Sequence, residues 1–263
     1  MTDTVRALAA NALAGFVATL VLLLGAACGA WWLALRRRRR VAADGLPSPP
    51  KIAVYLGLSG AVVVSAAAVF ATLAWQMSSG RLAQFDQAFT DGIRQSVPLG
   101  VAHVFALVTH FGDSVTLAAL CVSIATALVL SGSRCLALWW VLAIAGNGTL
   151  NRTLKHVFER VRPMQDPTLA LADGWSFPSG HTSGSLVAYG MLAYVLVRAL
   201  PRAWHLPALL AATTVAFTTA CSRVFIQVHF ASDVLAGIAS GTAWLVVCIC
   251  GCELSCFGRA RQR

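Results

Sequence analysis

The stretch from Ile52 to Ser79 reads IAVYLGLSGAVVVSAAAVFATLAWQMSS and contains no charged residue. A helix of about 20 predominantly apolar residues spans the hydrocarbon layer of a bilayer. We therefore expect an all-α fold, a polytopic transmembrane helical bundle. Six further apolar runs are long enough, or nearly long enough, to span as well: Ala7–Leu35, Ser114–Ser133, Cys135–Asn151, Thr182–Val197, Leu206–Ser222 and Val234–Cys252.

The composition agrees with a membrane protein. Hydrophobic residues make up 58% of the 263-residue chain and charged residues only 11%, and the mean hydropathy is +0.73. Soluble globular proteins carry about 25% charged residues. These numbers exclude a water-soluble fold as well as a disordered, collagen-like or coiled-coil chain.

Basic residues gather in loops on one side of the expected bundle. The run Arg36–Arg40 directly follows the first apolar stretch, and Arg134, Arg198 and Arg202 lie in later loops on the same side. Short loops rich in arginine face the cytoplasm, so we expect a multi-pass protein of the inner or plasma membrane. A five-arginine run can also bind nucleic acid or anionic lipid. Its position beside an apolar run favours a membrane anchor, and we expect no nucleic-acid partner.

The same pattern predicts three regions. Residues 1–40 form an N-terminal transmembrane helix with its basic anchor, residues 52–252 form a membrane-embedded domain, and residues 253–263 form a basic cytoplasmic tail. Arg6 is the only basic residue before the first apolar run, whereas five arginines follow it. We therefore expect the N-terminus of this run on the outer side. Counting the apolar stretch Gln95–Gly112 as a span would move every later basic loop to the other side. We therefore expect it to be interfacial or re-entrant.

The eight cysteines do not indicate a disulfide framework. Seven of them lie in or at the ends of apolar runs, where cysteine behaves as a small hydrophobic residue. A metal site at the C-terminal cysteine cluster is the weaker alternative, because no histidine stands nearby and the spacing is not CxxC. That cluster consists of Cys248, Cys250, Cys252 and Cys256.

Two polar stretches are expected on the outer side. Arg152–His181 lies between the fourth and fifth apolar runs, and Arg223–Asp233 lies between the sixth and seventh. Two spans separate these stretches, so they share a side of the membrane whatever the absolute orientation. They can therefore form one site.

The first polar stretch contains Lys155 and Arg162, followed by Pro163. A spacing of seven residues is two helical turns, so we expect both cations on one helix face, with the proline ending the helix. Alone, such cations at a membrane surface are more often residues whose charged ends reach out to the headgroups.

The end of that stretch reads Phe177-Pro178-Ser179-Gly180-His181 and opens the fifth apolar run. Ser179 is a good N-cap, and Gly180 allows close backbone approach. A helix start offers free N–H groups to an anion, and His181 in the first turn would face it. The alternative is a capped helix with an interfacial histidine.

The last polar stretch carries Arg223, His229 and Asp233. His229 and Asp233 are four residues apart, one helical turn, within hydrogen-bonding reach. A carboxylate on one ring nitrogen fixes the tautomer and leaves the other nitrogen as a nucleophile or base. His181 has no carboxylate in its own motif, so we expect the two histidines to have different roles. The alternative is a plain ion pair at the membrane surface.

Together the stretches supply the cations Lys155, Arg162 and Arg223, and helix-start amides. This set suits a group with about two negative charges, such as phosphate. No pair of carboxylates offers a Mg²⁺ site, so we expect the cations to neutralise the phosphate without metal or other cofactor.

The three motifs, taken in order, resemble the signature of the type 2 phosphatidic acid phosphatase (PAP2) superfamily, which includes vanadium haloperoxidases and glucose-6-phosphatase. The resemblance covers about Ile52 to Cys252 and is to its bacterial membrane lipid phosphatases. The matching motifs are Lys155-x6-Arg162-Pro163, Pro178-Ser179-Gly180-His181 and Ser222-Arg223-x5-His229-x3-Asp233.

The resemblance implies a six-helix phosphatase core over residues 52–252, with the first helix extra to it. It also implies a metal-independent phosphatase that works through a phosphohistidine. His229 would be the nucleophile, Asp233 its orienting partner and His181 the general acid. The phosphate would be held by Lys155, Arg162, Ser179, Gly180 and Arg223.

The expected function is therefore hydrolysis of a lipid phosphate or diphosphate among membrane lipids, at a site facing the periplasm or other extracytoplasmic side. The resemblance suggests phosphatidic acid, phosphatidylglycerol phosphate or undecaprenyl diphosphate as substrates. Two alternatives stay open: a lipid phosphotransferase using the same site, and a non-enzymatic anion or lipid transporter. A haloperoxidase is disfavoured, because a membrane bundle suits lipid substrates better.

Overall fold

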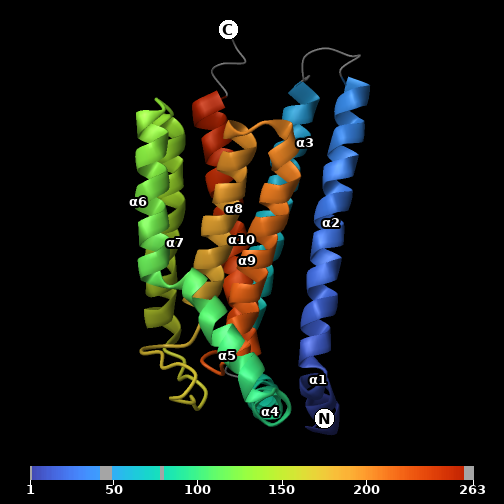
Figure 1. The fold of residues 1–263 in the computed structure, drawn as a ribbon, viewed down its shortest axis with the longest axis vertical. Coiled ribbons are helices and arrows are strands. Elements are labelled where there is room, and N and C mark those ends of the chain that lie inside the picture. Colours follow the sequence, from blue (N-terminus) through green and yellow to red (C-terminus); the bar gives the residue numbers. More distant parts are fainter. Residues whose placement is uncertain (1, 42–48, 78–79, 258–263) are drawn as a thin grey trace.

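The computed structural model describes residues 2–41, 49–77 and 80–257, and all regular secondary structure in these ranges is helical. Figure 1 shows that the long helices run roughly parallel. They are α2 (Ala12–Val41), α3 (Pro49–Gln76), α6 (Ser114–Leu130), α7 (Arg134–Phe158), α8 (Gly180–Ala199), α9 (His205–Phe225) and α10 (Ala231–Cys252). The shorter elements are α1 (Thr2–Ala10), α4 (Gly80–Ser96), α5 (Leu99–Val108), η1 (Thr109–Gly112), η2 (Arg202–Trp204) and the π-helix η3 (Glu253–Phe257).

The expected all-α transmembrane bundle is confirmed. In the described ranges, four helical stretches are long and apolar enough to cross a membrane, and α5–η1 with α6 makes a fifth if this pair, bent by 41°, is counted as one span. The expected apolar runs in α7 and α8 are not among these membrane-spanning candidates. Figure 1 shows both helices alongside the others. Both carry buried polar residues, among them Asn147 and Asn151 on α7, which face Ser183 on α8.

The expected N-terminal helix is broken at Asn11, which separates α1 from α2. The break lets α1 pack against α4, where Val5 and Ala9 are buried. Gly92 on α4 makes this approach possible, because a Cβ atom there would lie 2.5 Å from that of Ala9. The first apolar run is therefore two helices rather than one.

The helices that carry the three motifs pack around α8. It contacts α7, α9 and α10. A large apolar core lies between α6, α7, α8 and α10, around Trp140, Val187, Met191 and Cys248. A second core lies where α5 meets the end of α9, and the rings of Phe105 and Phe225 stack there with centroids 4.3 Å apart. This second core fixes the oblique helix α5 beside the motif that follows α9.

The two polar stretches lie at the same end of the bundle, as the spacing of the spans predicts. Figure 1 shows the α7–α8 and α9–α10 connections at the lower end, together with α4, α5 and α1. The segment Gln95–Gly112, expected to be interfacial or re-entrant, forms the end of α4, then α5 and η1. It reaches the base of α6 obliquely.

One pair of cysteines departs from the expectation. Cys135 at the start of α7 and Cys256 in η3 form a disulfide, at the end of the bundle opposite to the motifs. The sequence places these two residues 121 positions apart, so no local pattern indicates the pairing. A metal site formed by the whole C-terminal cysteine cluster is excluded while this bond exists, because Cys256 is one of its members.

Candidate active site

The first motif does not lie on one helix face, so this expectation is wrong. Helix α7 ends at Phe158, because Glu159 adopts the left-handed conformation with φ 43°, and Arg162 lies in the following loop. The two cations still converge. Lys155 Nζ and Arg162 Nη2 both donate to the carbonyl oxygen of Trp175, the latter at 3.2 Å. The loop, rather than helical periodicity, brings them together.

The second motif begins α8 as predicted, with Ser179 as the N-cap. The Ser179 hydroxyl accepts from the Thr182 amide at 3.4 Å, and its own amide donates to the Asp233 carbonyl at 3.0 Å. Gly237 of α10 packs directly against this cap, since a Cβ atom there would lie 2.7 Å from the Ser179 carbonyl oxygen. The first turn of α8 is therefore fixed against the first turn of α10.

The third motif spans a loop and a helix start rather than one helical turn. His229 lies in the connection after α9, and Asp233 lies in the first turn of α10. The two side chains nevertheless meet, with 3.3 Å between His229 Nδ1 and Asp233 Oδ2. Both are buried, with His229 only 1% exposed.

The neighbours of His229 define its tautomer. Arg162 Nη1 lies 3.1 Å from His229 Nε2, and a guanidinium can only donate, so Nε2 carries a lone pair. The proton is therefore on Nδ1, which donates to Asp233. Burial, followed by the positive charges of Arg223, Arg162 and Lys155, holds the pKa of His229 well below its usual value. His229 is thus neutral, with one nitrogen available for attack.

Arg223 is a buried cation with unused hydrogen-bonding capacity. Its side chain is 4% exposed, and Nη1 donates to Thr109 Oγ1 at 2.6 Å. Its Nε–H has no hydrogen-bond partner within the described parts of the chain. Buried guanidinium groups normally have all their donors paired, so an N–H left over beside two other cations fits an anionic ligand.

Sequence reasoning missed a buried network behind His229. Arg160 donates to Asp233 Oδ1 at 2.6 Å and to Asp86 Oδ2 at 2.7 Å, and Asp86 also accepts from Ser232. Asp86 belongs to α4, far from the motifs in sequence, so no spacing connects it with them. A continuous chain of contacts therefore runs from the His229 imidazole through the Asp233 carboxylate and the Arg160 guanidinium to the Asp86 carboxylate.

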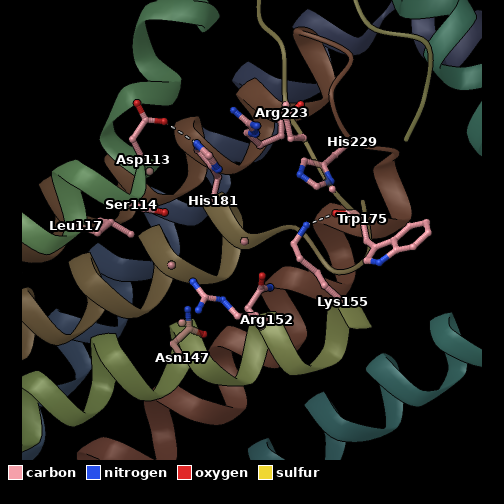
Figure 2. Close-up of a pocket in the computed structure, with 18 of the residues that line it drawn as sticks. Asp113, Ser114, Leu117, Asn147, Arg152, Lys155, Trp175, His181, Arg223 and His229 are labelled. Carbon is pink, nitrogen blue, oxygen red and sulfur yellow. Dashed lines mark hydrogen bonds and ion pairs between the residues drawn. The ribbon is translucent and has the colours of Figure 1, made fainter. Parts of the chain in front are cut away.

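The predicted site residues surround a cavity of about 1030 Å³. Figure 2 shows Lys155, His181, Arg223 and His229 directed into this space. Arg162 and Gly180 also line it, whereas Ser179 and Asp233 lie behind the lining. All eight predicted residues are therefore gathered at one place. Within the described ranges, no group of three His, Cys, Asp or Glu side chains is arranged to hold a metal ion.

A second carboxylate, which the sequence analysis did not pair with a histidine, faces this cavity. Asp113, at the bend between η1 and α6, places Oδ1 2.8 Å from His181 Nε2. Figure 2 marks this contact on the side of His181 away from His229. Each of the two histidines therefore has a carboxylate partner, although that of His181 comes from another part of the chain.

Comparison with known proteins identifies the class. The family model of the PAP2 superfamily matches residues 136–253. The chain belongs to the PAP2 superfamily and is a membrane phosphatase of that class, which confirms the resemblance drawn from the motifs.

Two relatives are similar over larger parts of the chain. Phosphatidylglycerophosphatase B of Bacillus subtilis (strain 168) is 34% identical over an alignment of 142 residues that covers 51% of this chain and 66% of that protein. The crystal structure of the first transmembrane PAP2 type phosphatidylglycerolphosphate phosphatase from Bacillus subtilis superposes with a TM-score of 0.69 at 29% identity. This match covers 73% of the present chain and 96% of the other.

Proposed function

We propose that this protein hydrolyses a lipid phosphate monoester through a phosphohistidine on His229. The observation that carries the proposal is the unprotonated Nε2 of a neutral histidine, which faces Arg162 at 3.1 Å in the wall of a cavity that Lys155 and Arg223 also line. A nucleophile and a phosphate-binding set are thus present in one place. Anion binding alone would not need a histidine held in this tautomer.

The first chemical step is an in-line displacement at phosphorus. His229 Nε2 attacks, the bond between phosphorus and the lipid oxygen breaks, and His181 gives a proton to that departing oxygen. Asp233 stabilises the positive charge that develops on the His229 ring. The equatorial oxygens are held by Lys155, Arg162, Arg223 and the amide of Gly180. Ser179, whose own amide donates to the Asp233 carbonyl, supports this set as the helix cap.

The second step returns the enzyme to its starting state. Neutral His181 accepts a proton from water, the water oxygen attacks phosphorus, and the bond between phosphorus and Nε2 breaks. Inorganic phosphate leaves, His181 is again protonated and His229 is again neutral. The step needs neither a metal nor another cofactor.

We propose phosphatidylglycerol phosphate as the substrate, because both Bacillus relatives are named for activity on this lipid. The test is release of inorganic phosphate by purified protein from short-chain phosphatidylglycerol phosphate, with phosphatidic acid and undecaprenyl diphosphate in parallel. His229→Ala is the control, and excess EDTA should leave the rate unchanged. Absence of phosphate release from all three lipids would contradict the proposal. Lipid consumption without phosphate release would identify a phosphotransferase instead.

We also propose that the cavity faces the extracytoplasmic side. The basic loops lie at the opposite end of the bundle, which the positive-inside rule assigns to the cytoplasm. The Cys135–Cys256 disulfide lies at that same end, and disulfides persist mainly in oxidising compartments. The arginines therefore assign this end to the cytoplasm, whereas the disulfide assigns it to the oxidising, outer side. We give precedence to the arginines, because many loop charges act together.

Cysteine labelling on intact cells tests this orientation. Asp173→Cys lies at the cavity end and Ser131→Cys lies at the other end, each in a background without the native thiols. An impermeant maleimide should label position 173 and leave position 131 unlabelled. The reverse pattern would overturn the orientation, while the shared side of the two motif loops would stand.

A further inference from the structure

The segment Thr109–Asp113, with the sequence Thr-His-Phe-Gly-Asp, contacts two motif residues at once. Thr109 Oγ1 accepts from Arg223 Nη1 at 2.6 Å, and Asp113 Oδ1 lies 2.8 Å from His181 Nε2. The segment lies outside residues 136–253, which the family model matches. Its contacts are therefore not part of the three motifs.

The backbone of this segment is held firmly against α8 and α9. The Tyr189 hydroxyl of α8 donates to the Phe111 carbonyl at 2.8 Å. A Cβ atom at Gly112 would lie 2.7 Å from Thr219 Cγ2 and 3.0 Å from His181 Cδ2. Only a residue without a side chain fits here, and the close packing is what brings Asp113 to His181.

The charges around His181 explain why a carboxylate is needed. A general acid must carry a proton before it can give one, yet burial, followed by the positive charges of Arg223 and Arg162, lowers the pKa of His181 to about 4. Asp113 opposes this lowering through its hydrogen bond and its negative charge without cancelling it, and a bound phosphate dianion would oppose it further. The other oxygen of Asp113, Oδ2, lies 2.7 Å from Nδ1 of His110, whose side chain is 67% exposed at the rim.

We propose that Thr109–Asp113 is a fourth part of the active site, in which Asp113 is the positioning residue of His181 and Thr109 orients Arg223. The inference rests on the proposed function. The Nε2–H of His181 stays hydrogen-bonded to Asp113, and the proton on Nδ1 passes to the departing lipid oxygen. Asp113 itself neither gains nor loses a proton.

The test compares two leaving groups, because general acid help matters for a poor leaving group and little for an activated one. General acid–base catalysis contributes about 10²–10⁴-fold. Asp113→Asn keeps the shape and removes the charge, so it should lower kcat/KM for the lipid phosphate by about 10- to 100-fold, a part of that contribution. On p-nitrophenyl phosphate the loss should stay below about 3-fold, because this ester needs little acid help.

A double-mutant comparison separates positioning from general structural damage. Adding Asp113→Asn to His181→Ala should cause no further loss on either substrate, because the carboxylate acts through the imidazole. Asp91→Asn is the matched control, since this outer-side aspartate of α4 contacts Gln87 on the same helix, and it should leave both rates unchanged.

The outcomes are distinguishable. Equal losses on both substrates in Asp113→Asn, or losses that add to those of His181→Ala, would overturn the positioning role and leave the proposed function intact. If His181→Ala itself shows no dependence on the leaving group, His181 is not the general acid. The assignment in the proposed function and the inference built on it would then both be wrong.

Discussion

The two histidine–aspartate pairs of this site are built differently. His229 and Asp233 come from one motif, and their side chains are 2% and 0% exposed within a buried network. His181 and Asp113 come from segments 68 residues apart, and their side chains are 24% and 37% exposed at the cavity. A nucleophile has to attack in a fixed direction in every turnover, which suits a closed network. A proton donor has to reach leaving groups of varied shape, which suits a partly open position.

The largest effect expected from this difference concerns the nucleophile. His229→Ala should reduce phosphate release from both lipid phosphate and p-nitrophenyl phosphate to background, because no bond to phosphorus can form. His181→Ala should lose about 10²–10⁴-fold on the lipid and far less on the activated ester. Measurement of kcat/KM for both substrates in both variants decides the matter. A leaving-group dependence in His229→Ala instead of His181→Ala would reverse the two roles.

A second prediction concerns a variant that disturbs the buried pair, His229 and Asp233, and leaves the partly exposed pair, His181 and Asp113, unchanged. Arg160→Met leaves Asp86 and Asp233 buried without their cation, and breaking a buried ion pair typically lowers the free energy of unfolding by about 3–5 kcal/mol. Activity should fall by a similar factor on both substrates, since both need His229. Thermal unfolding in detergent and kcat/KM are the measurements.

Two further variants serve as controls for Arg160→Met. Asp86→Asn keeps Arg160 beside Asp233 and should be milder in both measurements. The double variant Arg160→Met with Asp86→Leu should recover part of the lost stability, because one uncompensated charge is removed. A loss in Arg160→Met that is confined to the lipid substrate would show that the network serves His181 rather than His229.

The smallest expected effect is in the pH dependence. The pKa of His229 lies well below its usual value of about 6.5, so its neutral, reactive form persists as the pH falls through that value. Activity depends on this neutral form and is lost only at the lower, folded-state pKa. The acidic limb of kcat/KM, after correction for the titration of the substrate measured separately, should therefore lie well below pH 6.5. An acidic limb centred near pH 6.5 would contradict a buried neutral His229.

The sequence predicts this architecture and the eight candidate residues that the structure gathers at one place, because the relevant signals are local. Apolar runs define the helices, and short motifs keep Ser179 beside Gly180 and His229 near Asp233. The expectation for Lys155 and Arg162 failed in its reasoning, since it assumed an unbroken helix through Glu159. A left-handed residue ended the helix earlier, and loop contacts restored the convergence.

The roles of Asp86, Asp113 and Arg160 could not be predicted from the sequence, for a different reason. Each contributes through a contact between distant segments, and the packing of helices, rather than a spacing along the chain, creates that contact. Gly112 illustrates the point, because its importance comes from Thr219 and His181 lying against it. Sequence alone gives no measure of such proximity.

The disulfide between Cys135 and Cys256 closes a covalent ring that contains all three motifs. Its two ends nearly coincide with the bounds of the family match, residues 136–253. Restricting an unfolded chain by a ring of this size stabilises the folded state by about 5 kcal/mol in the chain-entropy model. A protease cut in the α8–α9 connection would therefore leave this unit as one covalent piece under non-reducing conditions, and reduction would release two fragments.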